Sequence, residues 1–140
     1  MQIRPFQISD EAAVIELWSA CELIRPANDP ARDIRRKLQV NPEWFLVGLL
    51  NGRIIAAVMA GYEGHRGWIN YLAVHPEHRT RGYGRQIMAE AEKLLRAAGC
   101  PKINLQVRNG NRAVLEFYRR IGYVTDEVIS LGKRLESDEQ

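Results

Sequence analysis

A long apolar stretch interrupted by an Asn-Gly pair constrains the fold of this chain more than any other feature. The run WFLVGLL (44–50) is followed by Asn51-Gly52 and then by RIIAAVMAGY (53–62). Asn and Gly accept the positive φ angles of a two-residue hairpin turn, so the two runs are predicted to be antiparallel strands. After EGHRG comes WINYLAV (68–74), which is predicted to be a buried central strand because it is almost continuously apolar.

Helices and further strands are predicted on both sides of these three strands. Before them come an edge strand in 1–9 and helices over 11–21 and 31–40. After them come a helix over 83–98, a strand over 102–107, a helix over 111–122 and a closing pair of strands within 123–135. The order predicts a mixed α/β (α+β) protein. No repeat or long linker divides the 140 residues, so a single domain over 1–140 is expected.

Composition and charge give no positive indication of a nucleic-acid-binding, secreted or membrane protein. The 20 basic and 17 acidic side chains leave a formal charge of only +3, which is too small to indicate a nucleic-acid-binding protein by itself. Arg4, Asp10 and Glu11 interrupt any signal-peptide core, and no uncharged apolar run approaches the roughly 18 residues of a membrane helix. A cytoplasmic protein without a membrane partner is therefore expected.

Cysteine and histidine spacing gives no indication of a metal site. Cys21 and Cys100 are isolated thiols, so neither a disulfide framework nor a zinc site is indicated. The three histidines, His65, His75 and His78, lack the HExxH spacing of a zinc protease. We therefore expect no metal.

The segment HPEHRTRGYGRQI (75–87) places three arginines and two glycines at the start of the predicted helix over 83–98. A helix start already carries a positive partial charge and unpaired N–H groups, so cations there are unfavourable unless an anion binds. The P-loop pattern GxxxxGK[ST] is absent, and the dinucleotide pattern GxGxxG fails at Ile87. The segment indicates a phosphate site, with a purely structural turn as the alternative.

Two blocks of the sequence resemble the GNAT superfamily of acyl-CoA-dependent N-acyltransferases. The segment Arg79-Thr80-Arg81-Gly82-Tyr83-Gly84, preceded by LAVHPEHR, resembles the family signature of Arg or Gln, two residues, Gly, one residue, then Gly or Ala. The block VRNGNRAVLEFYRRIGY (107–123) resembles a second family segment through Asn111, Tyr118, Gly122 and Tyr123. The resemblance covers nearly the whole chain, and within the superfamily it is greatest to the YpeA-type bacterial acetyltransferases.

The resemblance implies a fold and an activity. The fold would be the GNAT fold: a mixed, mostly antiparallel sheet of six to seven strands, flanked by about four helices and splayed between the fourth and fifth strands. The activity would be acetyl transfer from acetyl-CoA, a co-substrate, to a primary amine of a small molecule or protein. Direct attack would occur in a ternary complex without a metal. A homodimer is left open, and the acceptor amine is not identified.

The resemblance also implies residues that bind coenzyme A. They are Leu72, Ala73, Val74, Arg79, Thr80, Arg81, Gly82, Tyr83, Gly84, Arg85, Asn111 and Tyr118. A backbone N–H near Leu72 would point at the thioester oxygen, and the Tyr118 hydroxyl would protonate the departing thiolate. Thr80 stands where the family often has glycine, and it is expected to be tolerated if its φ is negative.

The general base and the acceptor site are less defined. Gln106 stands where ribosomal-protein N-terminal acetyltransferases of the superfamily carry a glutamate, and an amide cannot accept the proton. Glu63 and His65 are the remaining candidates, with a solvated turn as the alternative for both. The acceptor site is expected near IRPANDP (24–30), where Arg25, Asn28 and Asp29 are candidates and the last two are also candidate turn or cap residues.

Two other functions are open at this point. Gln106 in place of a carboxylate is consistent with a regulatory module that binds coenzyme A with little catalysis. A nucleic-acid-binding protein is the weaker alternative; it would use a basic face of Arg35, Arg36, Lys37 and the arginines of 79–85.

Overall fold

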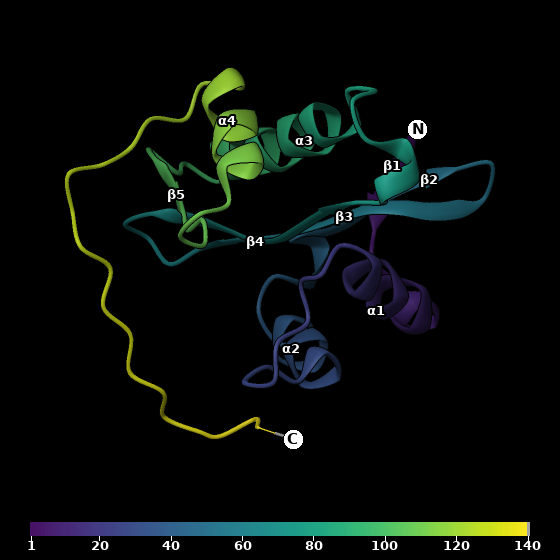
Figure 1. Ribbon diagram of the computed structural model, residues 1–140, viewed down its shortest axis with the longest axis horizontal. Helices are drawn as coiled ribbons and strands as arrows, with labels where there is room; N and C mark the ends of the chain where they lie inside the picture. Colours follow the sequence, from purple (N-terminus) through teal and green to yellow (C-terminus); the bar gives the residue numbers. More distant parts are fainter. Residues whose placement is uncertain (140) are drawn as a thin grey trace. The chain divides into compact units, whose positions relative to one another are not determined.

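The computed structural model describes residues 1–139 (Figure 1), which divide into two compact units. The first unit comprises Met1–Leu105 together with Asp138 and Glu139, and the second comprises Gln106–Ser137. Each unit is described by itself, and a single domain over 1–140 stays a prediction. Within residues 1–139, no helix combines the length and the apolar character needed to cross a membrane.

The first unit carries five strands and three α-helices. They are β1 (Gln2–Pro5), α1 (Glu11–Ala20), α2 (Pro30–Lys37), β2 (Phe45–Leu50), β3 (Arg53–Tyr62), β4 (Gly67–Val74), α3 (Tyr83–Ala97) and β5 (Ile103–Leu105), with short 3-10 turns at Ile8–Asp10, Pro42–Trp44 and Pro76–His78. The second unit carries α4 (Arg112–Arg120).

The five strands form one sheet in the order β1-β2-β3-β4-β5. The pairs β1–β2, β2–β3 and β3–β4 are antiparallel, and the pair β4–β5 is parallel. Asn51 and Gly52 have φ angles of 52° and 78°, so the Asn-Gly hairpin predicted between β2 and β3 is confirmed. β1 is an edge strand that ends at Pro5, a position where proline removes no ladder bond from a central strand.

Helices cover both faces of this sheet (Figure 1): α3 packs on one face, and α1 and α2 lie on the other. On the α1 face, Trp18 and Phe6 both stack on Phe45, with ring centroids 6.3 and 4.3 Å away. The buried residues around them are Val14, Leu17, Ile34, Val47, Ala57, Met59 and Ala73. On the other face, α3 buries Ile87, Met88, Ala91 and Leu95. Burial of each large apolar side chain stabilises the fold by roughly 1.5–3 kcal/mol.

Local sequence signals account for the ends of two helices. Asp29 is the N-cap of α2, where its carboxylate accepts the backbone N–H of Arg32 at 3.2 Å, and Pro30 is the first helical residue. This confirms the predicted cap. α3 ends before Gly99, whose φ of 89° suits glycine at the end of a helix.

The strand count differs from the predicted six to seven. The described residues contain five strands, and the closing pair predicted within 123–135 is not formed in them. Apolar side chains there are exposed: Val124, Val128, Ile129, Leu131 and Leu135. The segment has the composition of a strand, but a strand exists only where a neighbouring backbone pairs with it, and composition does not specify that neighbour. The mixed α+β fold itself matches the prediction.

Candidate active site

A β-bulge interrupts β4 near its C-terminal end. Ala57 pairs with Ala73 and Met59 pairs with Asn70, so two residues of β4, Tyr71 and Leu72, stand opposite Val58 alone. Tyr71 has a φ of 52°, in the left-handed region that bulky residues rarely adopt. A bulge leaves backbone groups outside the ladder, where they are available to another partner. This is the position at which a backbone N–H near Leu72 was expected to meet the thioester oxygen, and that role stays a prediction.

The other edge of β4 is paired over only part of its length. Gly67, Trp68 and Ile69 pair with Ile103–Leu105 of β5. In the described part of the chain, the ladder stops there, and residues 70–74 of β4 have no strand partner on this side. The ladder therefore ends just before the bulge, as the predicted splay between the fourth and fifth strands requires.

The start of α3 is suited to bind an anion. Its N-cap is Gly82, with a φ of 83°, so no side chain is present there to accept the first helical N–H groups. The first turn carries no acidic residue, and Gly84 is buried within it. The N–H groups of Tyr83, Gly84 and Arg85 thus begin a fifteen-residue helix whose positive end lacks a compensating charge of its own.

Thr80 has a left-handed backbone conformation instead of the predicted negative φ. Its φ is 63°, so the condition under which it would be tolerated without strain is not met. A β-branched side chain is unfavourable in the left-handed region because its Cβ substituents approach the backbone. The hydroxyl of Thr80 donates to the carbonyl oxygen of Arg79 at 2.6 Å, which holds the residue locally. The loop before α3 therefore carries backbone strain.

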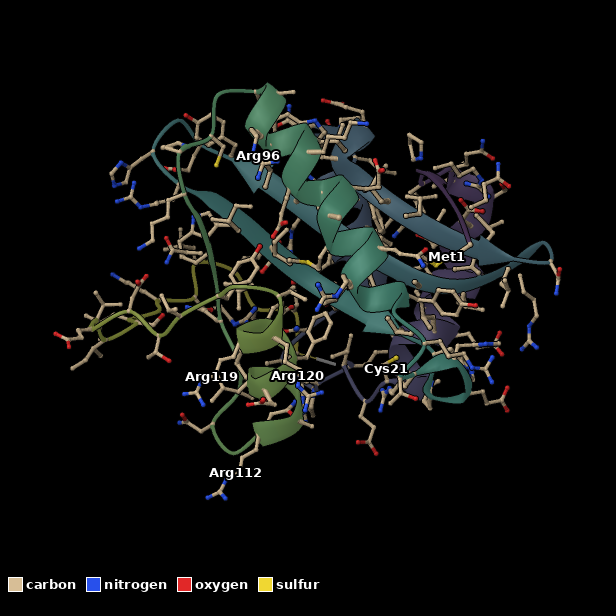
Figure 2. The ribbon with its side chains drawn as sticks, turned by 90° about the horizontal axis from the view of Figure 1, so that it is seen from above. Met1, Cys21, Arg96, Arg112, Arg119 and Arg120 are labelled. Atoms are coloured by element: carbon tan, nitrogen blue, oxygen red, sulfur yellow. The ribbon has the colours of Figure 1, made fainter. Side chains whose placement is uncertain are left out.

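The three arginines of this loop have different surroundings. The Nε of Arg79 donates to the carbonyl oxygen of Val74 at 3.3 Å, and the thiol of Cys21 donates to the same oxygen at 3.3 Å. Burial raises the pKa of Cys21, and a hydrogen bond with Arg79 partly opposes this rise. Figure 2 shows Cys21 near the start of α3 and Arg96 at its far end. Arg79 thus fixes the loop to the end of β4.

Arg81 and Arg85 are the more exposed cations. Nη1 of Arg81 lies 3.3 Å from Nδ1 of His78, and the Arg85 side chain is exposed on the first turn of α3. Two exposed cations beside N–H groups without a helical acceptor make a suitable site for a diphosphate. By contrast, the residues 1–139 contain no group of three or more His, Cys, Asp or Glu placed to hold a metal ion.

Asn111 and Tyr118 belong to the second unit. Asn111 is the N-cap of α4, and its Oδ1 accepts the N–H of Val114 at 3.3 Å. Tyr118 is buried, with Phe117 and Tyr123 packed edge-on at centroid distances of 5.2 and 5.6 Å. Burial raises the pKa of Tyr118, so its phenol is protonated at neutral pH and is a weaker acid than a solvent-exposed tyrosine. Figure 2 shows Arg112 and Arg119 pointing away from the same helix. The roles of Asn111 and Tyr118 stay predictions.

The two candidate bases lie at the opposite end of β4 from the bulge. The carboxylate of Glu63 accepts the backbone N–H groups of His65, at 2.9 Å, and of Arg66. These bonds lower the pKa of Glu63, and His65 is exposed. The turn precedes Gly67, and a strand rises about 3.3 Å per residue, so Leu72 lies about 17 Å further along β4. The turn explains both residues structurally, and their role as bases stays a prediction.

Sequence reasoning missed a polar cluster beside the bulge. The hydroxyl of Tyr71 donates to Oδ2 of Asp33 at 2.6 Å and accepts from Nδ2 of Asn28 at 3.4 Å. The ring stacks on Trp18 at 3.9 Å, and burial, with the hydrogen bond to Asp33, raises the pKa of Tyr71. The only local signal was a tyrosine inside an apolar run. Of the predicted acceptor residues, Asn28 lies in this cluster, Asp29 caps α2 and Arg25 is exposed.

Gln106, the residue in place of the expected glutamate, belongs to the second unit. Its side-chain amide donates a hydrogen bond to the hydroxyl of Ser130. An amide has no basic electron pair to accept a proton at neutral pH, so this contact adds no candidate base.

Comparison with known proteins gives a consistent set of similarities. Residues 11–123 match the model of the acetyltransferase (GNAT) family. An acetyltransferase of Yersinia pestis is 50% identical over 140 residues, covering 100% of this chain and 99% of that protein. The same identity and coverage hold for an acetyltransferase of Pectobacterium atrosepticum.

Solved structures resemble the fold. Ard1 from Thermoplasma volcanium has a TM-score of 0.80 at 23% identity, covering 88% of this chain and 82% of that one. AAC(6')-Iy, in complex with a bisubstrate analogue of coenzyme A and acetylneamine, has a TM-score of 0.77 at 18% identity, with 95% and 97% covered. At these identities the two structures show a shared fold alone.

Proposed function

Because this chain belongs to the acetyltransferase (GNAT) family, we propose that it transfers the acetyl group of acetyl-CoA directly to a primary amine held beside the β4 bulge. The family uses acetyl-CoA, and the chain is an acetyl-CoA-dependent N-acetyltransferase. The acceptor and the roles of individual residues are the parts that we propose.

The start of α3 would hold the diphosphate of coenzyme A. Its uncapped N–H groups at Tyr83, Gly84 and Arg85 would donate to phosphate oxygens, and the exposed Arg81 and Arg85 would supply positive charge. The residues present fit this group, because Gly82 leaves the helix end free of any side-chain acceptor. Arg79 is bonded to the carbonyl of Val74, so we assign it to holding the loop in place.

The bulge would stabilise the charge that develops during acetyl transfer. Acetyl-CoA supplies an activated thioester, so no covalent enzyme intermediate is required. As the amine nitrogen attacks the carbonyl carbon, negative charge gathers on the carbonyl oxygen; the carbonyl then re-forms as the C–S bond breaks and the thiolate leaves. A backbone N–H near Leu72, freed from the ladder by the bulge, donates to that oxygen.

Two protons must also move. The buried phenol of Tyr118, which is protonated at neutral pH, gives a proton to the departing thiolate; burial raises its pKa and so opposes this transfer rather than favouring it. The amine must lose a proton, and Glu63 and His65 remain the predicted acceptors. Their turn lies about 17 Å along β4 from Leu72, so either would act through intervening water molecules rather than by direct contact.

One observation carries this proposal: a single strand, β4, has a bulge at Tyr71–Leu72 and leads within eight residues of its end into the uncapped start of α3. The two features offer donors for two different parts of one extended co-substrate. A structural turn alone would explain the glycines. It would not explain why a β-bulge and a helix start that has arginines but no cap lie so close together in the chain.

A matched pair of arginine variants on α3 tests the phosphate site. Arg85→Ala, in the first turn, is expected to weaken coenzyme A binding measured by calorimetry, whereas Arg96→Ala, in the last turn, is expected to leave it unchanged. Both side chains are exposed, so neither change should alter folding. Equal affinities in the two variants would refute the assignment of the α3 start.

The same proteins distinguish the remaining functions. Thiol release from acetyl-CoA in the presence of amines and peptides is the expected result. Saturable coenzyme A binding without release for any acceptor would favour the regulatory module. Binding of duplex DNA that weakens steeply with salt, without coenzyme A binding, would favour the nucleic-acid alternative. A cytoplasmic location is part of the proposal, supported by the requirement for acetyl-CoA.

A further inference from the structure

Two arginines of α2 enclose a carboxylate from the far end of the chain. Nη1 and Nη2 of Arg36 lie 2.5 and 2.9 Å from the two carboxylate oxygens of Asp138, and Nη1 of Arg32 lies 3.2 Å from one of them. Asp138 is only 5% exposed. All three residues belong to the first unit. The contact joins positions 102 residues apart, so no local signal predicted it.

The chemistry of this contact is that of a carboxylate-binding site. Arg32 and Arg36 are four residues apart, which places them on one face of α2. The planar guanidinium of Arg36 bonds both carboxylate oxygens at once, the geometry in which arginine is most selective for carboxylates. Hydrogen bonds from Arg36, and then from Arg32, lower the pKa of Asp138 to about 2, against the opposing effect of burial.

This site is continuous with the polar cluster at the bulge. Nη1 of Arg36 also lies 3.4 Å from Oδ1 of Asp33, whose other oxygen accepts the hydroxyl of Tyr71. Tyr71 is the bulge residue of β4. Moving from α2 to the bulge, the side chains therefore offer a pair of cations, then a carboxylate, then the position proposed for the reacting acetyl group.

Such an order of charges fits one class of acceptor. A cationic pair attracts a carboxylate, and a carboxylate between it and the bulge attracts an ammonium group. An amine that carries both groups, such as an amino acid, satisfies both sites at once. A polycation such as an aminoglycoside has no carboxylate with which to replace Asp138 beside Arg32 and Arg36.

We propose that Arg32 and Arg36 recognise the carboxylate of a carboxylate-bearing amine acceptor, and that Asp138 occupies this site as an internal competitor. The inference rests on the proposed acetyl transfer for its substrate, but the carboxylate site can be tested separately. Asp33 is the acceptor-side carboxylate that holds the ammonium group before it loses its proton.

Matched amines test the acceptor class. Lysine is compared with cadaverine, and 4-aminobutyrate with propylamine, because the second member of each pair is the first without its carboxylate. The expected result is a kcat/KM at least about tenfold higher for the carboxylated member, the scale of a hydrogen bond to a charged group. Arg36→Gln should remove most of this preference by raising KM, whereas Arg35→Gln should keep it, because the exposed Arg35 lies outside the Asp138 contact. Equal rates within each pair would overturn the proposal.

The variant Asp138→Asn distinguishes two roles for Asp138: competition with the acceptor's carboxylate for Arg32 and Arg36, and a purely structural ion pair. Removing the internal carboxylate should lower KM for lysine several-fold with kcat unchanged, since a competitor affects only binding of the acceptor. A purely structural ion pair would leave KM unchanged. A pair of amidated peptides, Gly-Asp-Ala and Gly-Asn-Ala, shows whether the recognised carboxylate comes from a free amino acid or a peptide; a preference for the acidic peptide supports the proposal.

Glutarate provides a readout that needs no turnover. Calorimetry should show that glutarate binds Asp138→Asn more tightly than the natural protein, and that adding Arg36→Gln or Arg32→Gln to that variant abolishes binding. Thermal unfolding of each variant establishes that it is folded. Glutarate binding without acetylation of any amine would refute the acetyl-transfer assignment while keeping the site. Absence of glutarate binding to folded Asp138→Asn would overturn the site.

Discussion

Replacing Thr80 by glycine is expected to stabilise the protein, although the change removes a side chain and a hydrogen bond. Thr80 has a φ of 63°. An L-residue in this left-handed region costs roughly 1–2 kcal/mol. Glycine removes that cost but adds about 0.5–1 kcal/mol through the greater freedom of the unfolded chain. Loss of the exposed hydrogen bond from the Thr80 hydroxyl to the Arg79 carbonyl oxygen removes about a few tenths of a kcal/mol more from the gain in stability.

The net expectation is a gain of about 0.5 kcal/mol in the free energy of unfolding. With an unfolding entropy of roughly 2.1 cal/mol/K per residue, this corresponds to a rise of about 2 °C in Tm for a chain of this length. Urea denaturation and calorimetry on the same samples measure both quantities. Thr80→Val provides the opposite test, because it keeps the β-branch, loses the hydroxyl and is expected to lower stability.

Thr125→Gly is the matched control. Thr125 is exposed, lies outside every helix and strand, and does not have a positive φ. Glycine there is expected to destabilise by about 0.5–1 kcal/mol through the unfolded state alone. If Thr80→Gly and Thr125→Gly lower stability by the same amount, the loop before α3 stores no backbone strain and the argument is wrong.

Three further predictions concern other parts of the molecule. Gly67→Ala is expected to destabilise by about 1–3 kcal/mol in urea denaturation, because a Cβ there would meet Cys100 Sγ at 2.7 Å and Leu95 Cδ1 at 3.3 Å; an unchanged midpoint would contradict this. Tyr118→Phe is expected to reduce single-turnover acetyl transfer by up to about 10²-fold with coenzyme A affinity retained, and a rate within about threefold of the natural protein would limit Tyr118 to packing. The carboxyl of Asp138 is expected to titrate at about 2 by carbon NMR. Since this pKa lies below the unfolded value of about 3.9, its contribution to stability is present above pH 4 and lost as pH falls toward 2; a midpoint near 3.9 would mean that the arginines do not hold the carboxylate.

Short-range signals predicted the parts of the fold that short-range physics determines. Asn51-Gly52 specified the hairpin because few residue pairs accept its φ angles, and Asp29-Pro30 specified the start of α2 through the cap. The loop before α3 was found from charge and glycine spacing. Its backbone conformation at Thr80 was not, because threonine gives no sign of a positive φ.

Long-range contacts were the part that the sequence did not reveal. Tyr71 and Asp33 are 38 residues apart, and Arg36 and Asp138 are 102 apart, so no spacing rule connects them. The predicted closing strands failed for the same reason, since a strand depends on a partner backbone elsewhere in the chain. The candidate active site therefore divides into a half recognisable from motifs, at α3, and a half that only the fold assembles, at α2 and Tyr71.

The bulge in β4 also changes which of the two hydrophobic layers its alternate side chains point into. A Cβ on Gly67 would point at Leu95 of α3, whereas Tyr71, four residues later, stacks on Trp18 of α1. In an unbroken strand, residues four apart face the same side. The extra residue inverts the alternation of side chains. Odd-numbered residues of β4 therefore point toward α3 before the bulge and toward α1 after it. Deleting either Tyr71 or Leu72 would therefore give a regularly paired strand in which Ala73 still lies opposite Ala57 on the same face, and only the backbone groups that the bulge frees from the ladder would be lost.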